Sequence, residues 1–159
     1  MSIERRRKKL LVNWPNVEAS KFVQLNGVDW HVQIMGKGEE VLLLHGTGSA
    51  THSWTGFAAE LVSNYRVVML DLPGHGMTGC HDNKYFTLQG MAKGISDLLS
   101  SLHIQPRWVV GHSAGAAILV QMSLDKTIHP TALISLNGAL QPFGKSSAHM
   151  FSQAARFLA

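Results

Sequence analysis

Three short, mainly apolar segments of this chain each end at a loop rich in glycine or histidine, and this repeated pairing constrains the fold more than any other feature. The segments and their loops are 41–44 with 45–48, 66–70 with 71–76, and 108–110 with 111–115. Apolar runs of this length are typical of strands buried on both faces of a parallel sheet. Because ligand sites in such sheets lie beyond the carboxyl ends of the strands, we expect the three loops to share one functional edge.

The rest of the pattern predicts helices that alternate with these strands. A hairpin is expected around Asn26-Gly27, a strong turn signal. Its two strands are predicted at 22–25 and 30–35, the helices at 53–63, 88–102 and 114–124, and one more strand at 132–136. An antiparallel opening followed by strand-helix alternation predicts an α/β fold. Its sheet should be mainly parallel, with helices on both faces and right-handed crossovers.

Charge divides the chain into two parts. The formal net charge is +4, but residues 5–9 hold five of the 14 basic side chains. This predicts a flexible basic tail at 1–13 followed by one domain at 14–159. No basic stripe continues into the domain, which argues against nucleic acid as a partner. The tail is expected to be solvated; the alternative is that residues 5–9 contact an anionic membrane surface or an acidic partner.

Cysteine usage and hydropathy favour a cytoplasmic protein. Cys80 is the only cysteine, so an intrachain disulfide is excluded, and its thiol is expected to be inert. No apolar run reaches the roughly 18 residues of a membrane span, and the run after the basic start is too short for a signal peptide. The nine histidines do not pair with Cys or Glu at the usual ligand spacings. We therefore predict no metal and no cofactor.

The segment 111–115 reads G-H-S-A-G, which is the pattern G-x-S-x-G between a predicted strand and a predicted apolar helix. In that context the pattern is typical of a nucleophile elbow, where strained backbone lifts the serine above the sheet. We predict Ser113 as the catalytic nucleophile. The N–H of Ala114, at the start of the helix, is a natural oxyanion donor. A plain tight turn with a buried serine is the alternative.

The loop H-G-T-G at 45–48 could supply the second oxyanion donor. The N–H of Thr47 is the first choice and that of Gly48 the second, with Gly46 in the same loop. A glycine-rich turn without a ligand is the alternative. His45 is expected to be a structural, hydrogen-bonded histidine rather than the base. A base ahead of the nucleophile would break the hydrolase order of serine, acid and histidine.

Other residues near these loops are given supporting roles. Asp71 also precedes the serine, so it is expected to organise its loop rather than to be the triad acid. His75 is expected to be structural, and His112 to line the pocket. Trp54 and Met77 could line an apolar pocket, and Trp54 fits plain core packing equally well.

Taken together, H-G-T-G, D-x-P-G-H-G and G-H-S-A-G resemble the α/β-hydrolase superfamily. Longer strings resemble one branch of it, the magnesium-chelatase accessory hydrolases of bacteriochlorophyll biosynthesis, over residues 13–159. These strings are W-P-N at 14–16, W-H-V-Q at 30–33, the run 42–54, and S-L-N-G-A-L at 135–140 with Pro142-Phe143. The resemblance implies a cytoplasmic protein of a phototrophic bacterium that acts near magnesium insertion into protoporphyrin IX. Magnesium-chelatase subunits are then candidate partners.

Two functions remain open. The first is a serine hydrolase of an ester or amide, and the second is a non-catalytic accessory protein that binds a porphyrin or a chelatase subunit in the same pocket. A third, cofactor-free oxidative chemistry, is less favoured. Serine at the elbow argues against dehalogenase and epoxide-hydrolase chemistry, which use a carboxylate nucleophile.

The triad acid and histidine of the superfamily usually follow later strands. No Asp or Glu follows Asp125 in this chain, and neither His129 nor His149 stands where the base belongs. We therefore expect a domain cut at the start of the cap, without its C-terminal strands. Such a chain should be inactive alone and should leave the strand at 132–136 as an open edge.

Overall fold

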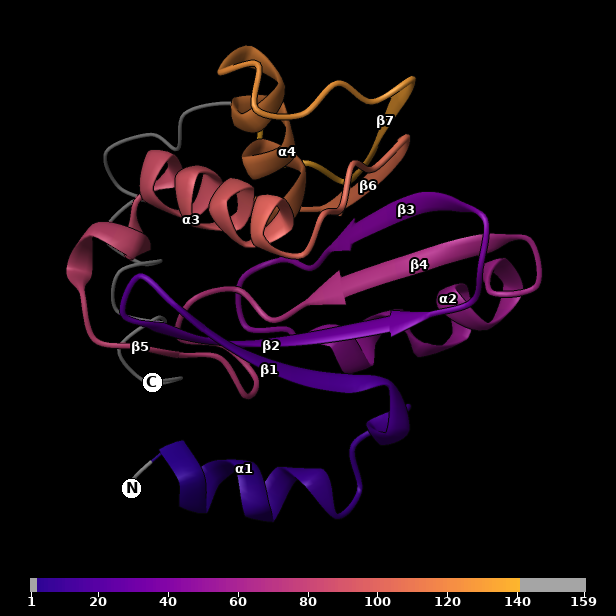
Figure 1. The fold of residues 1–159 in the computed structure, drawn as a ribbon. Helices are drawn as coiled ribbons and strands as arrows, with labels where there is room; N and C mark the ends of the chain where they lie inside the picture. The colour runs from indigo at the N-terminus through magenta and orange to yellow at the C-terminus, as the bar shows by residue number, and fades with distance from the viewer. Residues whose placement is uncertain (1–2, 141–159) are drawn as a thin grey trace.

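The structure, a computed structural model, describes residues 3–140 except for the side chains of Ile3 and Arg6, and Figure 1 shows its ribbon. The predictions for His149, for the string Pro142-Phe143 and for the start of a cap lie outside the described residues. Within them, strands and helices alternate after an antiparallel hairpin.

Within residues 3–140, seven strands form one mixed sheet in the order β1-β2-β4-β3-β6-β7, with β5 also paired to β2. The strands are β1 (Ser20–Leu25), β2 (Val28–Met35), β3 (Glu39–Leu44), β4 (Tyr65–Leu70), β5 (Gly79–Cys80), β6 (Trp108–His112) and β7 (Ala132–Leu136). Strand β3 is parallel to β4 and β6, and β6 is parallel to β7. Strand β2 is antiparallel to β1, β4 and β5. The predicted α/β class is confirmed, and the three loops follow three adjacent parallel strands.

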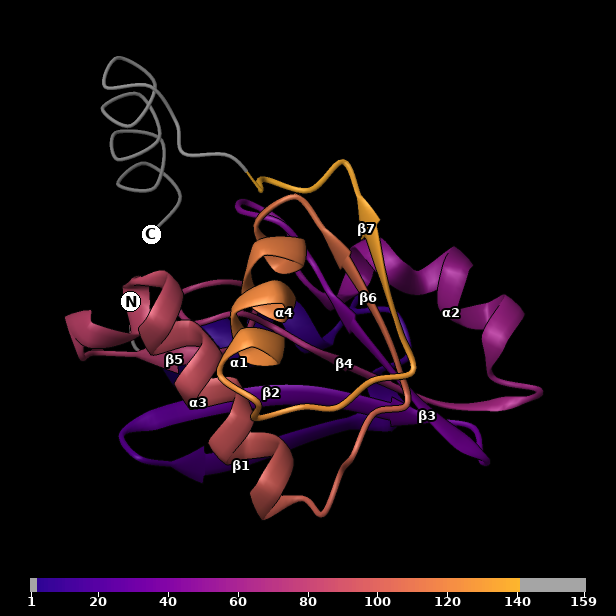
Figure 2. The ribbon, with the colours of Figure 1, turned by 90° about the horizontal axis from the view of Figure 1, so that it is seen from above.

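Helices cover both faces of the sheet, as predicted. They are α1 (Ile3–Leu11), α2 (Thr55–Leu61), α3 (Leu88–Ser101) and α4 (Ala114–Leu124), with 3-10 helices at Val17–Ala19, Thr51–Trp54 and Asn83–Phe86. Residues of α3 and α4 pack into one core cluster and Ala58 of α2 into the other. Figure 1 shows α3 and α4 at the upper left and α1 below β1, and Figure 2 shows α4 beside β6 and β7. The helix expected at 53–63 is divided, because a 3-10 turn ends at Trp54 before α2 begins.

Alternation along the central strand divides the core between the two faces. Leu42 and Leu44 of β3 are buried in the cluster that contains residues of α3 and α4. Val41 and Leu43 belong to the other cluster, which contains Ala58 of α2. Successive side chains of a strand point to opposite faces, so a run that is apolar at every position needs cover on both. This explains why the apolar runs predicted buried strands correctly.

Residues 3–11 form helix α1 instead of the flexible tail that the charge run predicts. A helix of this length gains little stability from its own propensity, so the local sequence favours a solvated chain. Contacts of Arg7 with the sheet explain the difference. Its Nε donates to the backbone oxygen of Met77 (3.1 Å), and its Nη2 donates to that of Asp29 (2.8 Å). The guanidinium also lies 4.3 Å from the centroid of the Phe22 ring.

Two further features bear on the surface of the molecule. Strand β7 ends the strand order within the described residues, where Ile134 and Leu136 are 47% and 39% exposed. Further strands are expected to pair with β7 at this edge. None of the helices between residues 3 and 140 is long and apolar enough to cross a membrane.

Candidate active site

Ser113 links β6 to α4 through a backbone conformation that L-residues rarely adopt. Its φ is 50° and its ψ is −115°. The conformation is held on both sides of the residue: the Ser113 N–H donates to the Leu136 oxygen (3.0 Å). The backbone oxygen of Ser113 accepts the N–H groups of Ala116 (3.2 Å) and Ala139 (3.1 Å). Such strain persists only where the surrounding structure over-determines it, and it concentrates at functional sites.

The glycines on either side of Ser113 are required by close packing. A Cβ on Gly111 would overlap the backbone of Ala116 in the first turn of α4. A Cβ on Gly115 would overlap the backbone oxygen of Leu44 at the end of β3. Helix α4 therefore approaches β3 and β6 closely only because these two positions lack side chains.

The loop after β3 also reaches the elbow. A Cβ on Gly46 would lie 2.9 Å from the Cβ of Ser113. The next two residues, Thr47 and Gly48, are exposed, and Ala114 begins α4 directly after the serine. The N–H groups in the first turn of a helix have no partner within the helix and favour an anion. The three predicted oxyanion donors thus belong to the two segments that meet at Ser113.

His45 is fully buried and connects two of the loops. Its Nδ1 lies 2.7 Å from the Gly46 oxygen, which can only accept, so Nδ1 carries the proton and donates. Its Nε2 accepts the N–H of Leu72 (3.0 Å). Burial lowers the pKa of His45 to about 4, so the ring is neutral near pH 7. With both nitrogens engaged, this imidazole fits the expected structural role rather than that of a base.

Asp71 is also fully buried and organises the edge of the sheet. Its Oδ1 accepts the N–H of Thr51 (2.7 Å), and its Oδ2 accepts the N–H of Met77 (2.8 Å). Burial alone would raise the pKa of this carboxyl, but the hydrogen bonds from His31, Met77 and Thr51 outweigh it and lower the pKa. The carboxylate is thus committed to the scaffold, as expected for a loop-organising residue.

Sequence reasoning missed the partner of Asp71. His31 of β2 is fully buried, with its Nδ1 2.7 Å from Oδ2 of Asp71 and its Nε2 2.8 Å from Oγ of Ser20. Gln33, two residues further along the strand, is buried as well, and its Nε2 donates to the Pro15 oxygen (2.7 Å). His31 and Gln33 continue a row of polar residues at alternate positions of β2 that begins with Asp29, and this row was the available signal for a polar network on that face.

The remaining predicted residues lie around the elbow and the core. Trp54 is 6% exposed and packs in the cluster beneath α2, which favours its core alternative, and Met77 is fully buried. His112 is exposed within the elbow. Nδ1 of His75 lies 3.0 Å from a backbone oxygen of its own loop. Cys80 is half-buried, and burial raises the pKa of its thiol, which fits an unreactive cysteine.

No imidazole within residues 3–140 is hydrogen-bonded to the Ser113 hydroxyl. The two buried histidines, His31 and His45, direct their ring nitrogens to other partners. Over the same range, no group of three His, Cys, Asp or Glu side chains is placed to hold a metal ion. The described site therefore consists of Ser113, the predicted nucleophile, and the predicted oxyanion donors around it.

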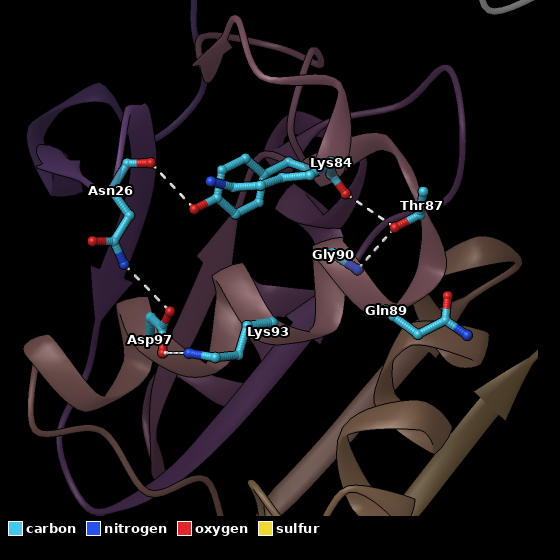
Figure 3. A pocket seen from close by; sticks show the side chains of 8 residues that line it. Asn26, Lys84, Thr87, Gln89, Gly90, Lys93 and Asp97 are labelled. Atoms are coloured by element: carbon cyan, nitrogen blue, oxygen red, sulfur yellow. Dashed lines mark hydrogen bonds and ion pairs between the residues drawn. The ribbon is translucent and has the colours of Figure 1, made fainter.

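A cavity of about 660 Å³ lies away from the elbow, at the start of α3 (Figure 3). It is lined by Asn26, Lys84, Tyr85, Thr87, Gln89, Gly90, Lys93 and Asp97. Its polar groups bond to one another: Asp97 accepts from Lys93 (2.5 Å) and from Asn26 (3.3 Å). A second cavity, of about 480 Å³, lies between the end of α3 and the loop before β7. Neither contains a predicted site residue.

Comparison with the sequences of known proteins adds three findings. The sequence model of the alpha/beta hydrolase family matches residues 41–159. The magnesium-chelatase 30 kDa subunit of Rhodobacter capsulatus is 36% identical over 96% of this chain and 54% of its own length. Protein phosphatase methylesterase 1 of Bos taurus is 36% identical over 58% of this chain and 26% of its own length.

The structure of an alpha/beta hydrolase fold protein from Burkholderia ambifaria superposes with a TM-score of 0.75 and 24% identity. That match covers 85% of this chain and 50% of the other, and it shows a shared fold. The chain thus spans about half the length, or less, of the relatives it matches.

Proposed function

The chain belongs to the alpha/beta hydrolase family, and on that premise we propose that it carries the nucleophile of a serine hydrolase, Ser113, which cleaves an ester or amide bond. The observation that carries the proposal is the backbone of Ser113, with φ 50° and ψ −115° between β6 and α4. A strained serine at a strand-helix junction presents its hydroxyl at the edge of the sheet where ligands bind.

The surrounding N–H groups support acyl transfer. When the Ser113 oxygen attacks a carbonyl carbon, negative charge develops on the carbonyl oxygen. The N–H of Ala114 at the start of α4 and that of Thr47, with Gly48 as the alternative, are the proposed donors to this oxygen. Their preorganisation rests on the contact between Gly46 and Ser113 and on the bonds of His45 to both neighbouring loops. His112 is proposed to line the pocket beside them.

The proton of Ser113 needs a base that the described residues do not place beside it. We assign the triad histidine and its acid to positions outside residues 3–140. Groups of a triad act as a unit, so the loss of one removes most of the rate that the others provide. The 159-residue chain alone is therefore proposed to be inactive.

The physiological setting is proposed from the similarity to the magnesium-chelatase 30 kDa subunit, which extends over 96% of this chain. The protein would then act in the cytoplasm, in support of magnesium insertion during bacteriochlorophyll biosynthesis, with chelatase subunits as partners. The same similarity favours a second candidate function, in which the protein binds a porphyrin or a chelatase subunit without catalysis. Fold alone does not separate the two functions.

Hydrolysis of p-nitrophenyl acetate by the natural protein, as its source organism produces it, distinguishes the two candidate functions, serine hydrolysis and non-catalytic binding. Ser113→Ala should abolish turnover, whereas Ser123→Ala, which changes a serine bonded to its own helix, should leave turnover intact. Equal turnover in both variants would remove Ser113 as the nucleophile. Protoporphyrin IX binding that persists in Ser113→Ala, together with an absence of turnover in the unmodified protein, would favour the non-catalytic function.

A further inference from the structure

The basic run of the chain is held on the sheet in one orientation. Arg7 anchors helix α1 through two hydrogen bonds to backbone oxygens of the body and through its contact with Phe22. Burial is the main reason that the pKa of the Arg7 guanidinium is lowered. One of the five cations therefore serves to attach the helix, and its position decides where the others lie.

The cations on the far side of α1 are exposed. Each residue turns the helix by about 100°, so Arg5 and Lys9, two positions before and after Arg7, lie on the side opposite to it. Arg5, Lys8 and Lys9 are all exposed. Figure 1 shows α1 on the side of the sheet away from α3 and α4, where it projects as a separate layer. Cations thus cover the outer surface of this layer.

Apolar side chains accompany these cations. Val12, directly after α1, is 77% exposed, the largest exposed fraction among the big apolar residues of the described chain. Val17 and Phe22, which follow in the sequence, are 40% and 41% exposed. Phe22 lies beneath Arg7, where α1 meets the sheet, and Val12 follows the exposed Lys8 and Lys9 directly at the end of the helix. We call α1 together with Val12, Val17 and Phe22 the basic surface.

We propose that the basic surface docks the protein onto a bilayer rich in anionic lipid. Lysine and arginine side chains are attracted to anionic headgroups, and neighbouring apolar side chains enter the interface beneath them. Residues 10–159 hold nine basic and nine acidic side chains, so the net positive charge of the chain comes from residues 1–9. The binding is peripheral, and it is independent of the proposed chemistry at Ser113.

The exposed valine is what favours lipid over an acidic protein. An acidic protein patch would neutralise the cations but would leave Val12 in water unless it also offered a matching apolar pocket. A bilayer interface accepts both groups without a fixed shape, because its lipids rearrange around them.

Sedimentation with vesicles tests the proposal. The probes are vesicles of pure phosphatidylcholine and vesicles with 30% phosphatidylglycerol. The chain should bind only the anionic vesicles, and binding should weaken as salt rises. The triple variant Arg5→Gln, Lys8→Gln, Lys9→Gln should bind about a hundredfold more weakly, since each cation near an anionic surface contributes about fivefold.

A matched control removes three charges elsewhere. Lys21→Gln, Lys37→Gln, Lys126→Gln changes exposed lysines and reaches the same net charge as the α1 triple variant. It should keep most of the binding. Val12→Ser should weaken binding to anionic vesicles without changing the net charge, and circular dichroism of each variant checks that the fold is intact.

Three results would overturn the proposal. The first is an absence of binding to anionic vesicles at low salt. The second is an equal loss of binding in the two triple variants, which would indicate a general charge effect. The third is binding to polyglutamate without binding to vesicles, which would assign the basic surface to an acidic macromolecule instead.

Discussion

Nδ1 of His31 lies 2.7 Å from Oδ2 of Asp71, and both side chains are completely buried. The pair joins β2 to the loop after β4. The same carboxylate accepts the N–H of Thr51, beyond the loop after β3, and the N–H of Met77. One buried anion therefore fixes the positions of β2, of the segment at Thr51 and of the segment at Met77 relative to one another.

Asp71→Asn should destabilise the protein strongly. An amide keeps the shape of the carboxyl but replaces one acceptor oxygen with a donor, so a buried N–H loses its partner. Breaking a buried, hydrogen-bonded pair from one side costs about 3 kcal/mol. The measurement is urea unfolding, with Glu60→Gln on the exposed side of α2 as the control. A loss of stability equal to that of the control would contradict the scaffold role.

Stability should fall as the pH drops from 6.5 toward 4, in part through His45. Its folded pKa of about 4 lies below the ordinary value of 6.5, so the unfolded chain binds the proton more readily in this window. The contribution of the neutral His45 ring to the free energy of unfolding is fully present above pH 6.5, and roughly 3 kcal/mol is lost by pH 4. The lowered pKa of Asp71 adds a further loss only below its ordinary value of 3.8.

The variant His45→Asn isolates that contribution. Its stability at neutral pH should be lower, but its dependence on pH between 6.5 and 4 should be flatter than that of the unmodified protein. The exposed His129→Asn provides the comparison and should keep the original slope. Equal slopes in all three proteins would show that His45 does not titrate as its burial requires.

Gly115→Ala should destabilise the elbow although alanine favours helix. The added methyl group would overlap the backbone oxygen of Leu44, which a rigid strand cannot move away. Overpacking of this kind costs about 1–3 kcal/mol. Gly56→Ala, in the helix α2 with open space around it, should instead stabilise by about 0.5–1 kcal/mol. Thermal unfolding of the two variants measures whether each change lowers or raises the stability of the protein. Stabilisation by Gly115→Ala would contradict the close contact of α4 with β3.

The elements that the sequence predicts well are those whose signal is local. Helix α4 and strand β7 have the predicted bounds, because a long apolar run and a short one, each bounded by polar or turn residues, leave little choice. The position of Ser113 followed from five consecutive residues. Strand β5 is only two residues long and carries no pattern of its own.

The features that were missed depend on partners far away in the chain. Helix α1 is stabilised by the bonds of Arg7 to Asp29 and Met77, which follow it in the chain by 22 and 70 positions. No local sequence pattern indicates those contacts. The His31–Asp71 pair spans 40 residues. Sequence reasoning recognised Asp71 as a loop organiser but had no means of locating the imidazole that bonds to it.

The most direct test of the central claim is covalent labelling of the natural protein by a fluorophosphonate, with the modified peptide identified by mass spectrometry. The probe reacts with a serine only when its hydroxyl is activated and its oxyanion donors are in place. One adduct is expected, on Ser113, and it should disappear in Ser113→Ala and persist in Ser123→Ala. An intact, folded protein that gives no adduct, or an adduct on another residue, would contradict the central claim.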